Sequence, residues 1–199
     1  MHIEVDTAAT ERRYQKLAAY YHANVLQDDD FCCRHCAACK ASYTSATGNY
    51  AAGQLNAPGT HYDLTVDGKP LRIVIVGQES GTGRAHTDMA ARRAAIANTA
   101  TTQRFIAEPG YPARTQHMKG ITNLLRLLFG KGLGTDYAGE FVTLESGETV
   151  HLLHCFALVN YLLCSAHSAT RSKRGESTAT MRRNCHEHFR ATLEILEPT

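Results

Sequence analysis

Hydrophobic and polar positions recur along the chain with two different spacings, and together they predict a mixture of helices and strands. Segment 9–27 spaces its apolar residues as an amphipathic helix does, with Thr10 as the expected N-cap. Segment 117–132 carries a leucine-rich stripe and ends in glycines, which is typical of a second helix. A last helix starts near the sequence TATMRR and ends at Pro198, whereas 41–60 shows no periodicity and is expected to be a loop.

Two stretches combine β-rich runs with turn residues and predict hairpins. In 61–77 the runs flank Asp67-Gly68, a strong hairpin signal, and the second run, LRIVIV, is apolar at nearly every position. Such a strand is typically covered on both faces, so we expect it in the interior of a sheet. In 140–156 the turn falls at a Ser-Gly pair, and the return strand is expected to run on to Cys164.

The order hairpin, helix, hairpin, helix predicts the fold class. We expect a single α/β domain over residues 1–199, a three-layer α/β/α sandwich whose helices cover a central mixed sheet. In sheets of this kind, ligands bind beyond the carboxyl ends of the central strands. Segments 76–84 and 159–168 follow such strand ends, so they are the expected location of a site.

Composition narrows the class of protein. A hydrophobic fraction of 43% beside 20% charged residues is ordinary for a soluble globular chain. The longest apolar run is too short for a membrane span, and the N-terminus lacks the apolar core of a secretory signal. We therefore expect a cytoplasmic protein without membrane association. The net charge of +2 does not by itself indicate a nucleic-acid partner.

Cysteine is concentrated in FCCRHCAACK at 31–40, which holds four of the seven, whereas Cys155 is expected to be a buried small hydrophobic residue. In a reducing compartment such a group favours a metal site over disulfides. Spacing alone leaves three interpretations open. A zinc knuckle would use neighbouring residues, namely Cys33, Cys36, Cys39 and either His35 or His22. A redox protein would use Cys32/Cys33 with Cys36, and an iron–sulfur centre would recruit distant cysteines.

The strand end VGQESGTGR at 76–84 combines glycines with polar side chains. Glycine lets the backbone turn sharply and approach a ligand closely, while Gln78 and Glu79 offer an amide and a carboxylate. The segment lacks the spacing of a P-loop and of a dinucleotide-binding turn. A plain glycine turn with a solvated glutamate is the alternative.

Asn160 interrupts the apolar run LLHCFALVNYLLC. An amide in a buried strand needs hydrogen-bond partners, because an unsatisfied buried polar group costs about 1–3 kcal/mol. Since an amide both donates and accepts, Asn160 at a strand tip either reads the edge of a nucleobase or bonds to a neighbouring loop.

Five short motifs follow one another along the chain: CRHCAAC, GQESG, HMKGITNLL, NYLLC and CHEHF. In this order the sequence resembles the iron–sulfur uracil-DNA glycosylases, the family 4 type and their relatives. The resemblance implies a uracil-DNA glycosylase-like fold with a [4Fe–4S] cluster. The implied ligands of the cluster are Cys36, Cys39, Cys164 and Cys185, and Cys33 could take the place of Cys36 or Cys39. Four thiolates also suit tetrahedral zinc, so zinc is the alternative cofactor.

The resemblance also implies a reaction, hydrolysis of the N-glycosidic bond of a flipped uracil or related damaged base in DNA. It assigns catalysis to Glu79, Gln78 and Asn160, and base binding to Gly77, His117, Met118 and Asn160. Family 4 members carry their carboxylate directly after the first glycine, where this chain has Gln78, and Glu79 falls one place later. We expect Glu79 to activate or orient water, Asn160 to read the uracil edge and His117 to stack on the base.

The loop between the last two implied ligands is basic. Contacts with DNA phosphates are expected from Arg171, Lys173, Arg174 and Arg183. The partner is then DNA, single-stranded or uracil-containing. The alternative is a non-catalytic iron–sulfur or zinc nucleic-acid-binding protein on the same fold.

The end of the chain departs from the family. There, another central strand and a histidine-bearing loop follow the C-x-x-F helix, and that histidine stabilises the leaving base. Here the sequence closes at Thr199. We expect either a C-terminally incomplete chain, or a partner or further chain segment that completes the sheet, or a fold that binds without catalysis.

Overall fold

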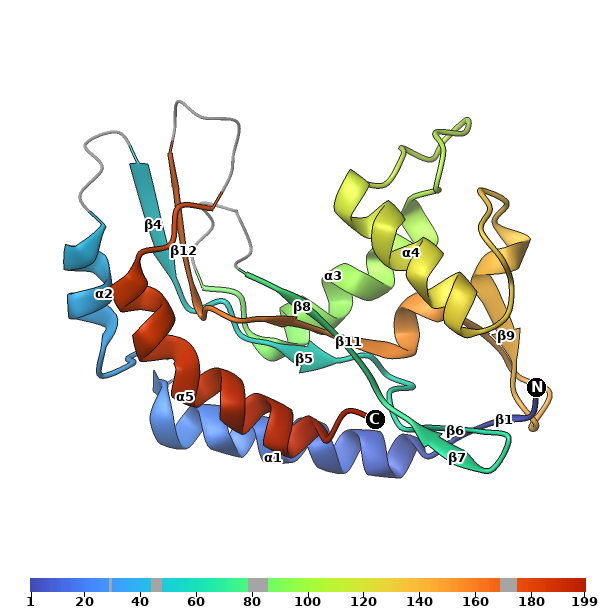
Figure 1. The fold of residues 1–199 in the computed structure, drawn as a ribbon, viewed down its shortest axis with the longest axis horizontal. Coiled ribbons are helices and arrows are strands. Elements are labelled where there is room, and N and C mark those ends of the chain that lie inside the picture. The colour runs from blue at the N-terminus through green and yellow to red at the C-terminus, as the bar shows by residue number, and fades with distance from the viewer. Residues whose placement is uncertain (29, 44–47, 79–85, 169–174) are drawn as a thin grey trace.

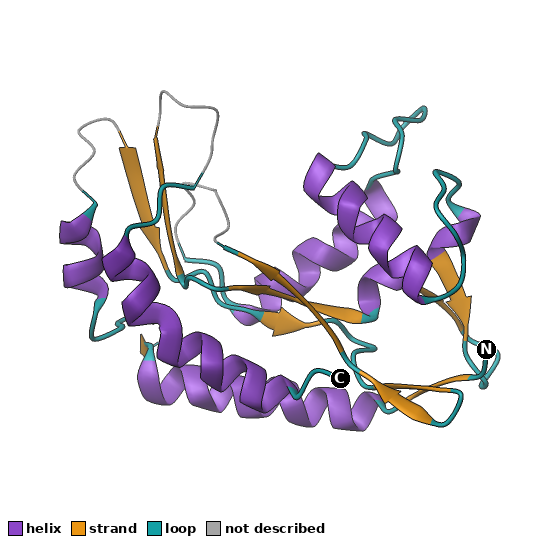
Figure 2. Cartoon of the chain, in the orientation of Figure 1, coloured by secondary structure: helices purple, strands orange, loops and turns teal. Residues whose placement is uncertain are grey.

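The computed structural model describes residues 1–28, 30–43, 48–78, 86–168 and 175–199. Within them the chain is a mixed α/β protein with five helices among the described residues and several small sheets, one of them mixed (Figures 1 and 2), so the α/β part of the predicted fold class is confirmed. The α-helices are α1 (Thr7–Asn24), α2 (Cys36–Ser42), α3 (Met89–Thr102), α4 (Gln116–Leu128) and α5 (Ala179–Leu196).

One mixed sheet lies at the centre of the molecule (Figure 1), with the strand order β5-β11-β8. Strand β11 (Phe156–Asn160) runs parallel to β8 (Ile73–Gly77) and antiparallel to β5 (Ala57–Pro58). The parallel pair is in register from Phe156 opposite Ile73 to Asn160 opposite Gly77. The carboxyl ends of β8 and β11 therefore meet at one edge of the sheet.

Strand β8 is the second half of the apolar run LRIVIV, and its predicted place in the interior of a sheet is wrong. Among the described residues β8 pairs with β11 alone, and the Val76 side chain is 50% exposed. The apolar pattern arose because both faces of β8 are partly covered, which says nothing about whether a second strand lies beside it.

Helices pack against both faces of this sheet. Ile73 of β8 belongs to a core cluster with Ile96 of α3 and Ile121 of α4. Val74, which points the opposite way because strand side chains alternate, packs against a cluster that contains Leu196 of α5. Helix α1 lies alongside α5 (Figure 1) and contacts β5. Helical residues thus contact both faces of β8 at its start.

The two predicted hairpins are present. Strands β6 (Leu64–Val66) and β7 (Lys69–Leu71) pair antiparallel around Asp67 and Gly68, which both have positive φ, and β1 (Ile3–Val5) pairs with β6. Strands β9 (Phe141–Thr143) and β10 (Thr149–His151) form the second hairpin. Its return strand does not run on to Cys164, because the 3-10 turns η1 (Ala138–Glu140) and η2 (Leu152–His154) bound the hairpin and β11 begins only at Phe156.

The predicted loop over 41–60 is also wrong. Strand β4 (Gly48–Ala52) pairs antiparallel with β12 (Cys164–Ser168), and β5 follows in the same stretch. The short ribbon β4–β12 rises beside α2 and the first turns of α5 (Figure 1). Small residues in β4 hid the period that a strand normally shows. A further short pair, β2 (Leu26–Gln27) with β3 (Asp30–Phe31), connects α1 to the cysteine-rich segment.

Helix boundaries follow the capping side chains. Helix α1 is capped by Asp6, whose carboxylate accepts from the Ala9 N–H, and not by Thr10, which is buried. Thr178 and Thr115 cap α5 and α4 in the same way.

The alanine-rich helix α3 was not predicted. None of the described helices combines the length and the apolarity needed to cross a bilayer.

Candidate functional site

The structure brings Gly77 and Asn160 together at the ends of two parallel strands. Asn160 lies opposite Gly77 in the ladder, and a Cβ added to Gly77 would lie 3.1 Å from Asn160 Oδ1. The Tyr161 N–H donates to the Gly77 carbonyl at 2.7 Å, and the Leu162 N–H donates to the Gln78 carbonyl at 2.9 Å. These bonds extend the pairing beyond the strands, so the two tips are fixed relative to each other.

The Asn160 side chain is 5% exposed. Its backbone is held by Asn56, because the Asn160 N–H donates to Asn56 Oδ1 at 2.8 Å and Asn56 Nδ2 donates to the Asn160 carbonyl at 3.2 Å. The side-chain amide of Asn160 has no hydrogen bond to any of the described residues. A buried amide that takes no part in holding its own strand is available for a ligand. Sequence reasoning did not find Asn56, since nothing in its local pattern marks it.

Gln78 follows Gly77 directly and is exposed to solvent. Its amide donates to Ser177 Oγ, and Ser177 also receives hydrogen bonds from Arg182, to its carbonyl at 2.7 Å and to Oγ at 3.2 Å. This chain of contacts ties the tip of β8 to the start of α5. Glu79, the predicted water-activating residue, lies outside the described residues.

The predicted base-binding residues His117 and Met118 belong to the first turn of α4. His117 is exposed, and no interaction joins it to Gly77 or Asn160 in the part of the chain that is described. Met118 packs against the core cluster between α4 and the sheet, so its side chain is used for packing. Thr115, not His117, caps the helix.

Cysteines from distant parts of the sequence meet at the base of the β4–β12 ribbon. Cys39 of α2, Cys164 at the start of β12 and Cys185 of α5 share one buried cluster, with exposed fractions of 2%, 3% and 4%. Cys36, at the start of α2, is half-buried, and its sulfur lies 3.9 Å from the Tyr50 hydroxyl. The four cysteines implied by the resemblance therefore lie together.

Hydrogen-bond donors are directed at three of these sulfurs. The Tyr50 hydroxyl donates to Cys164 Sγ at 3.0 Å, and Asn184 Nδ2 donates to Cys39 Sγ at 3.5 Å. The backbone of Leu163 acts on Cys185 in the same sense, because its hydrogen bonding lowers the pKa of that thiol. A neutral thiol is a weak acceptor, whereas a thiolate is a strong one. These donors, taken by themselves, thus favour the anionic form.

Burial opposes that form. It raises the pKa of Cys185 to about 12 and also raises the pKa of Cys164 above its ordinary value of 9.0, and the neighbouring cysteines add to both effects. Burial together with Cys164 likewise raises the pKa of Tyr50, so that its hydroxyl remains a donor. Thiolates in this position would require a positive counter-charge among them.

As placed, these cysteines do not form a metal site: in the stretches that the structure describes, no group of three or more His, Cys, Asp or Glu side chains is arranged to hold a metal ion. The chemistry of the donor set is nevertheless that of ligating thiolates, because it consists of sulfur alone, is mostly buried, and has N–H and O–H donors directed at it.

The other cysteines have different surroundings. Cys33 packs with the helix α1 cluster, and its sulfur lies 3.5 Å from His188 Nε2, while Tyr20 Oη lies 2.8 Å from His188 Nδ1. Cys32 is exposed. Cys155 is fully buried and burial raises its pKa to about 12, as expected for a small hydrophobic residue.

The predicted DNA-contacting residues divide into two groups. Arg183 is exposed on the first turns of α5, two positions before Cys185. The remaining three, Arg171, Lys173 and Arg174, lie outside the described residues.

Comparisons of this chain with family models, with curated proteins and with solved structures give no match.

Proposed function

We propose that Cys36, Cys39, Cys164 and Cys185 hold a [4Fe–4S] cluster and that the protein is a uracil-DNA glycosylase-like enzyme. The fold proposed with it is the three-layer α/β/α arrangement of that family, in which helices cover both faces of the mixed sheet. The proposal is supported first by the gathering of cysteines from α2, β12 and α5 into one buried cluster. It is also supported by the neighbouring strand tips, where Asn160 faces Gly77.

The observation that carries the proposal is the set of donors aimed at the sulfurs. Asn184 and Cys39 are 145 positions apart in the chain, and Tyr50 and Cys164 are 114 apart, yet each pair is joined at sulfur. Hydrogen bonds to cysteine sulfur are the usual environment of a ligating thiolate. A bound cluster would supply a rigid cross-link between α2, β12 and α5, beside the strand tips.

The chain's own residues would then act on a flipped base. Asn160 would read the uracil edge with its amide, and the backbone at Gly77 would approach the base closely. The C1′–N bond breaks with its electron pair leaving on uracil, water adds to C1′, and the proton of that water passes to Glu79. Arg183 would bind a phosphate of the strand.

Release of free uracil from a single-stranded uracil-containing oligonucleotide tests this activity. We expect release by the wild type, and losses of about 100-fold or more for Glu79→Gln and Asn160→Ala, as is usual for groups that act in the transition state. Asn160→Ala should fold, because the backbone of residue 160, not its side chain, bonds to Asn56. Asn98→Ala, an exposed asparagine of α3, is the matched control and should retain activity.

The second candidate is a non-catalytic iron–sulfur or zinc protein that binds nucleic acid on the same fold. It is favoured by the packing of Met118 into the core and by the exposed position of His117, which leave the base-stacking role unassigned. Binding of the oligonucleotide without release, unchanged in Glu79→Gln, would support this candidate and contradict the first.

A further inference from the structure

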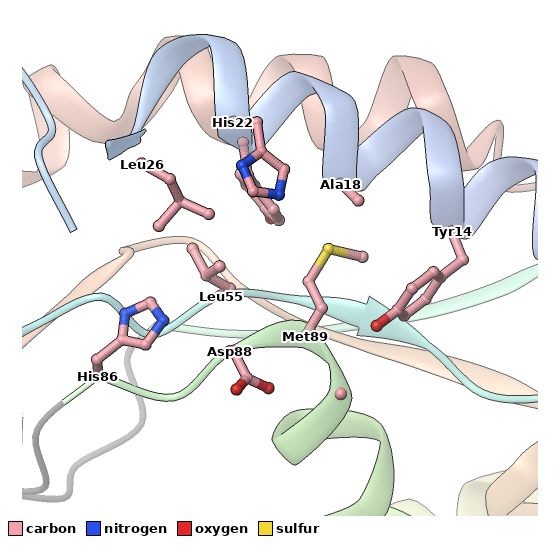
Figure 3. Close-up of a pocket in the computed structure, with 10 residues that line it drawn as sticks. Tyr14, Ala18, His22, Leu26, Leu55, His86, Asp88 and Met89 are labelled. Atoms are coloured by element: carbon pink, nitrogen blue, oxygen red, sulfur yellow. The ribbon is translucent and has the colours of Figure 1, made fainter. Parts of the chain in front are cut away.

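A pocket separate from the cysteine centre lies between α1 and the start of α3 (Figure 3). Its volume is about 380 Å³. Such a volume is within the range of small-molecule sites, which are mostly apolar with a few polar groups. Leu55 and Tyr21, both fully buried, contribute to its floor together with Met89. None of the residues that line it is a cysteine, so it does not belong to the site described above.

Polar groups stand around this apolar floor on opposite sides. His22 comes from the last turn of α1, and His86 and Asp88 come from the segment that leads into α3, with Leu55 and Met89 between them (Figure 3). Tyr14 lies at the far end with its ring beside Met89. Two imidazoles, a phenol and a carboxylate thus stand around a mainly apolar floor.

The rim is rigidly attached to the rest of the protein. The Thr87 N–H donates to the Gly53 carbonyl at 2.7 Å, and the Leu55 N–H donates to the Thr87 carbonyl at 3.0 Å. His86 lies against Gly53, where an added Cβ would be 2.4 Å from His86 Nδ1. On the other side, the guanidinium of Arg93 lies 4.0 Å from the centre of the Tyr14 ring and holds it in place. The polar groups are therefore positioned before any ligand arrives.

The lining also restricts the charge of a ligand. Among the described residues that form the pocket there is no Lys or Arg, and Asp88 is the one carboxylate. Phosphates are normally bound by Arg, Lys or helix N-termini, and here the α3 N-terminus is already capped by Asp88, which accepts from the Ala91 N–H at 2.6 Å. A phosphate placed beside Asp88 would be repelled, whereas N–H groups on a neutral ring have acceptors there.

We propose that this pocket binds a flat, uncharged heteroaromatic molecule of nucleoside size. Its ring lies on the floor formed by Leu55 and Met89, and its polar edge meets His22, His86 and Asp88. Histidine and tyrosine rings suit such a ligand because they stack on flat rings and also exchange hydrogen bonds. The site is independent of the proposed glycosylase activity, and its failure would leave the cysteine assignment unchanged.

Titration calorimetry with adenosine, uridine and adenosine monophosphate tests the proposal. We expect saturable binding of at least one nucleoside and weaker binding of the monophosphate than of adenosine. Ala18→Trp places an indole in the pocket from α1 and should raise the Kd by about tenfold or more. Ala19→Trp, one position along the same helix but exposed and outside the pocket, should leave the Kd unchanged.

A second variant covers the case in which Ala18→Trp fails to fold, as judged by circular dichroism. His86→Ala removes one exposed ring at the rim and should raise the Kd by about fivefold, the loss typical of one hydrogen bond. The proposal is overturned if neither nucleoside saturates, if the monophosphate binds more tightly than adenosine, or if the folded pocket variants bind as well as the wild type.

Discussion

The cluster around Glu140 and the cluster around Cys164 both bury polar groups, but among the described residues a counter-charge is present only in the first. Arg114 Nη2 lies 2.6 Å from Glu140 Oε2, and the two side chains are 0% and 1% exposed. His151 Nε2 lies 2.8 Å from the same oxygen. At the cysteines, the described neighbours of sulfur are a phenol, an amide and the backbone of Leu163, all of them neutral.

This difference separates a group that is charged within the protein from sulfurs that would be charged only with the proposed cluster bound. Burial alone would raise the pKa of Glu140, but hydrogen bonds from His151 and Arg114 outweigh it and hold the pKa below its ordinary value of 4.5. Oε2 of this carboxylate is therefore paired with charged and hydrogen-bonding protein groups, whereas Oε1 has no partner among the described residues. At Cys164 burial raises the pKa, so its thiol stays neutral unless a bound cation, as in the proposed cluster, favours the thiolate.

Removal of iron should have the largest effect, and it should act on one region only. Structural metals contribute on the order of 10 kcal/mol to the folding of the elements they join. After iron removal we expect hydrogen exchange to lose protection in α2, β4 and β12, while the Glu140 cluster and the β8–β11 pair keep theirs. Equal loss of protection in both regions, or none in either, would contradict the contrast between them.

Arg114→Met should come next. It leaves Glu140 buried beside a neutral histidine, and breaking a buried ion pair from one side costs about 3–5 kcal/mol. Urea unfolding would measure this loss. Arg12→Met is the control, because Arg12 is 65% exposed and 3.5 Å from Asp6, and exposed pairs contribute about 0–1 kcal/mol. If Arg114→Met lowers the free energy of unfolding no more than Arg12→Met does, Arg114 is not the counter-charge that stabilises the buried Glu140.

Acid should destabilise the protein in two windows. Burial lowers the pKa of His151, His154 and His188 in the folded protein below the ordinary value of 6.5. As the pH falls below 6.5, these histidines take up protons in the unfolded chain before they do so in the folded protein, and the free energy of unfolding declines. The lowered pKa of Glu140 adds a second decline that begins near 4.5. Glu140→Gln should be less stable at neutral pH, and its free energy of unfolding should decline less than that of the wild type below about pH 4.5. Unfolding free energies between pH 3 and 8 check the sign, and a profile for Glu140→Gln parallel to the wild type throughout would refute the Glu140 assignment.

Tyr50→Phe should have the smallest effect. It removes the hydroxyl that donates to Cys164 Sγ at 3.0 Å without opening a cavity. We expect iron to be retained and the reduction potential to fall by on the order of tens of millivolts, because hydrogen bonds to sulfur stabilise the reduced cluster. Voltammetry would measure the shift. The control is Tyr43→Phe, because the hydroxyl of Tyr43 donates to Glu176 and not to a sulfur, so this variant should not change the potential. An equal shift in both variants would show that the hydrogen bond from Tyr50 to Cys164 does not set the potential.

The elements most accurately predicted from the sequence were those with local signals. Asp67-Gly68 specified a hairpin because both positions adopt positive φ, and the apolar spacing located three helices, although the one predicted cap, Thr10, was wrong. Strand β4 and the exposed edge of β8 could not be inferred in this way, because they depend on which segments meet in three dimensions. A small-residue strand such as β4 has no period of its own until β12 pairs with it.

In the candidate site, too, some residues could be inferred from the sequence and others only from the fold. The cysteine and asparagine positions could be found because sulfur and a buried amide are conspicuous in sequence. Their partners could not, since Tyr50, Asn56 and Asn184 are ordinary polar residues until the fold places them 3.0 Å, 2.8 Å and 3.5 Å from Cys164, the Asn160 backbone and Cys39. The expected stacking role of His117 was drawn from motif order alone, and its exposed position on α4 does not place it at the strand tips.

The central claim is that distant cysteines share one inorganic centre. It is tested most directly by iron and sulfide analysis with an absorption spectrum, on protein purified without oxygen. The account predicts absorption near 400 nm with about four irons per chain, lost in Cys164→Ser and Cys185→Ser and retained in Cys32→Ser. A colourless, iron-free wild type, or a Cys164→Ser variant that keeps its iron, would contradict it.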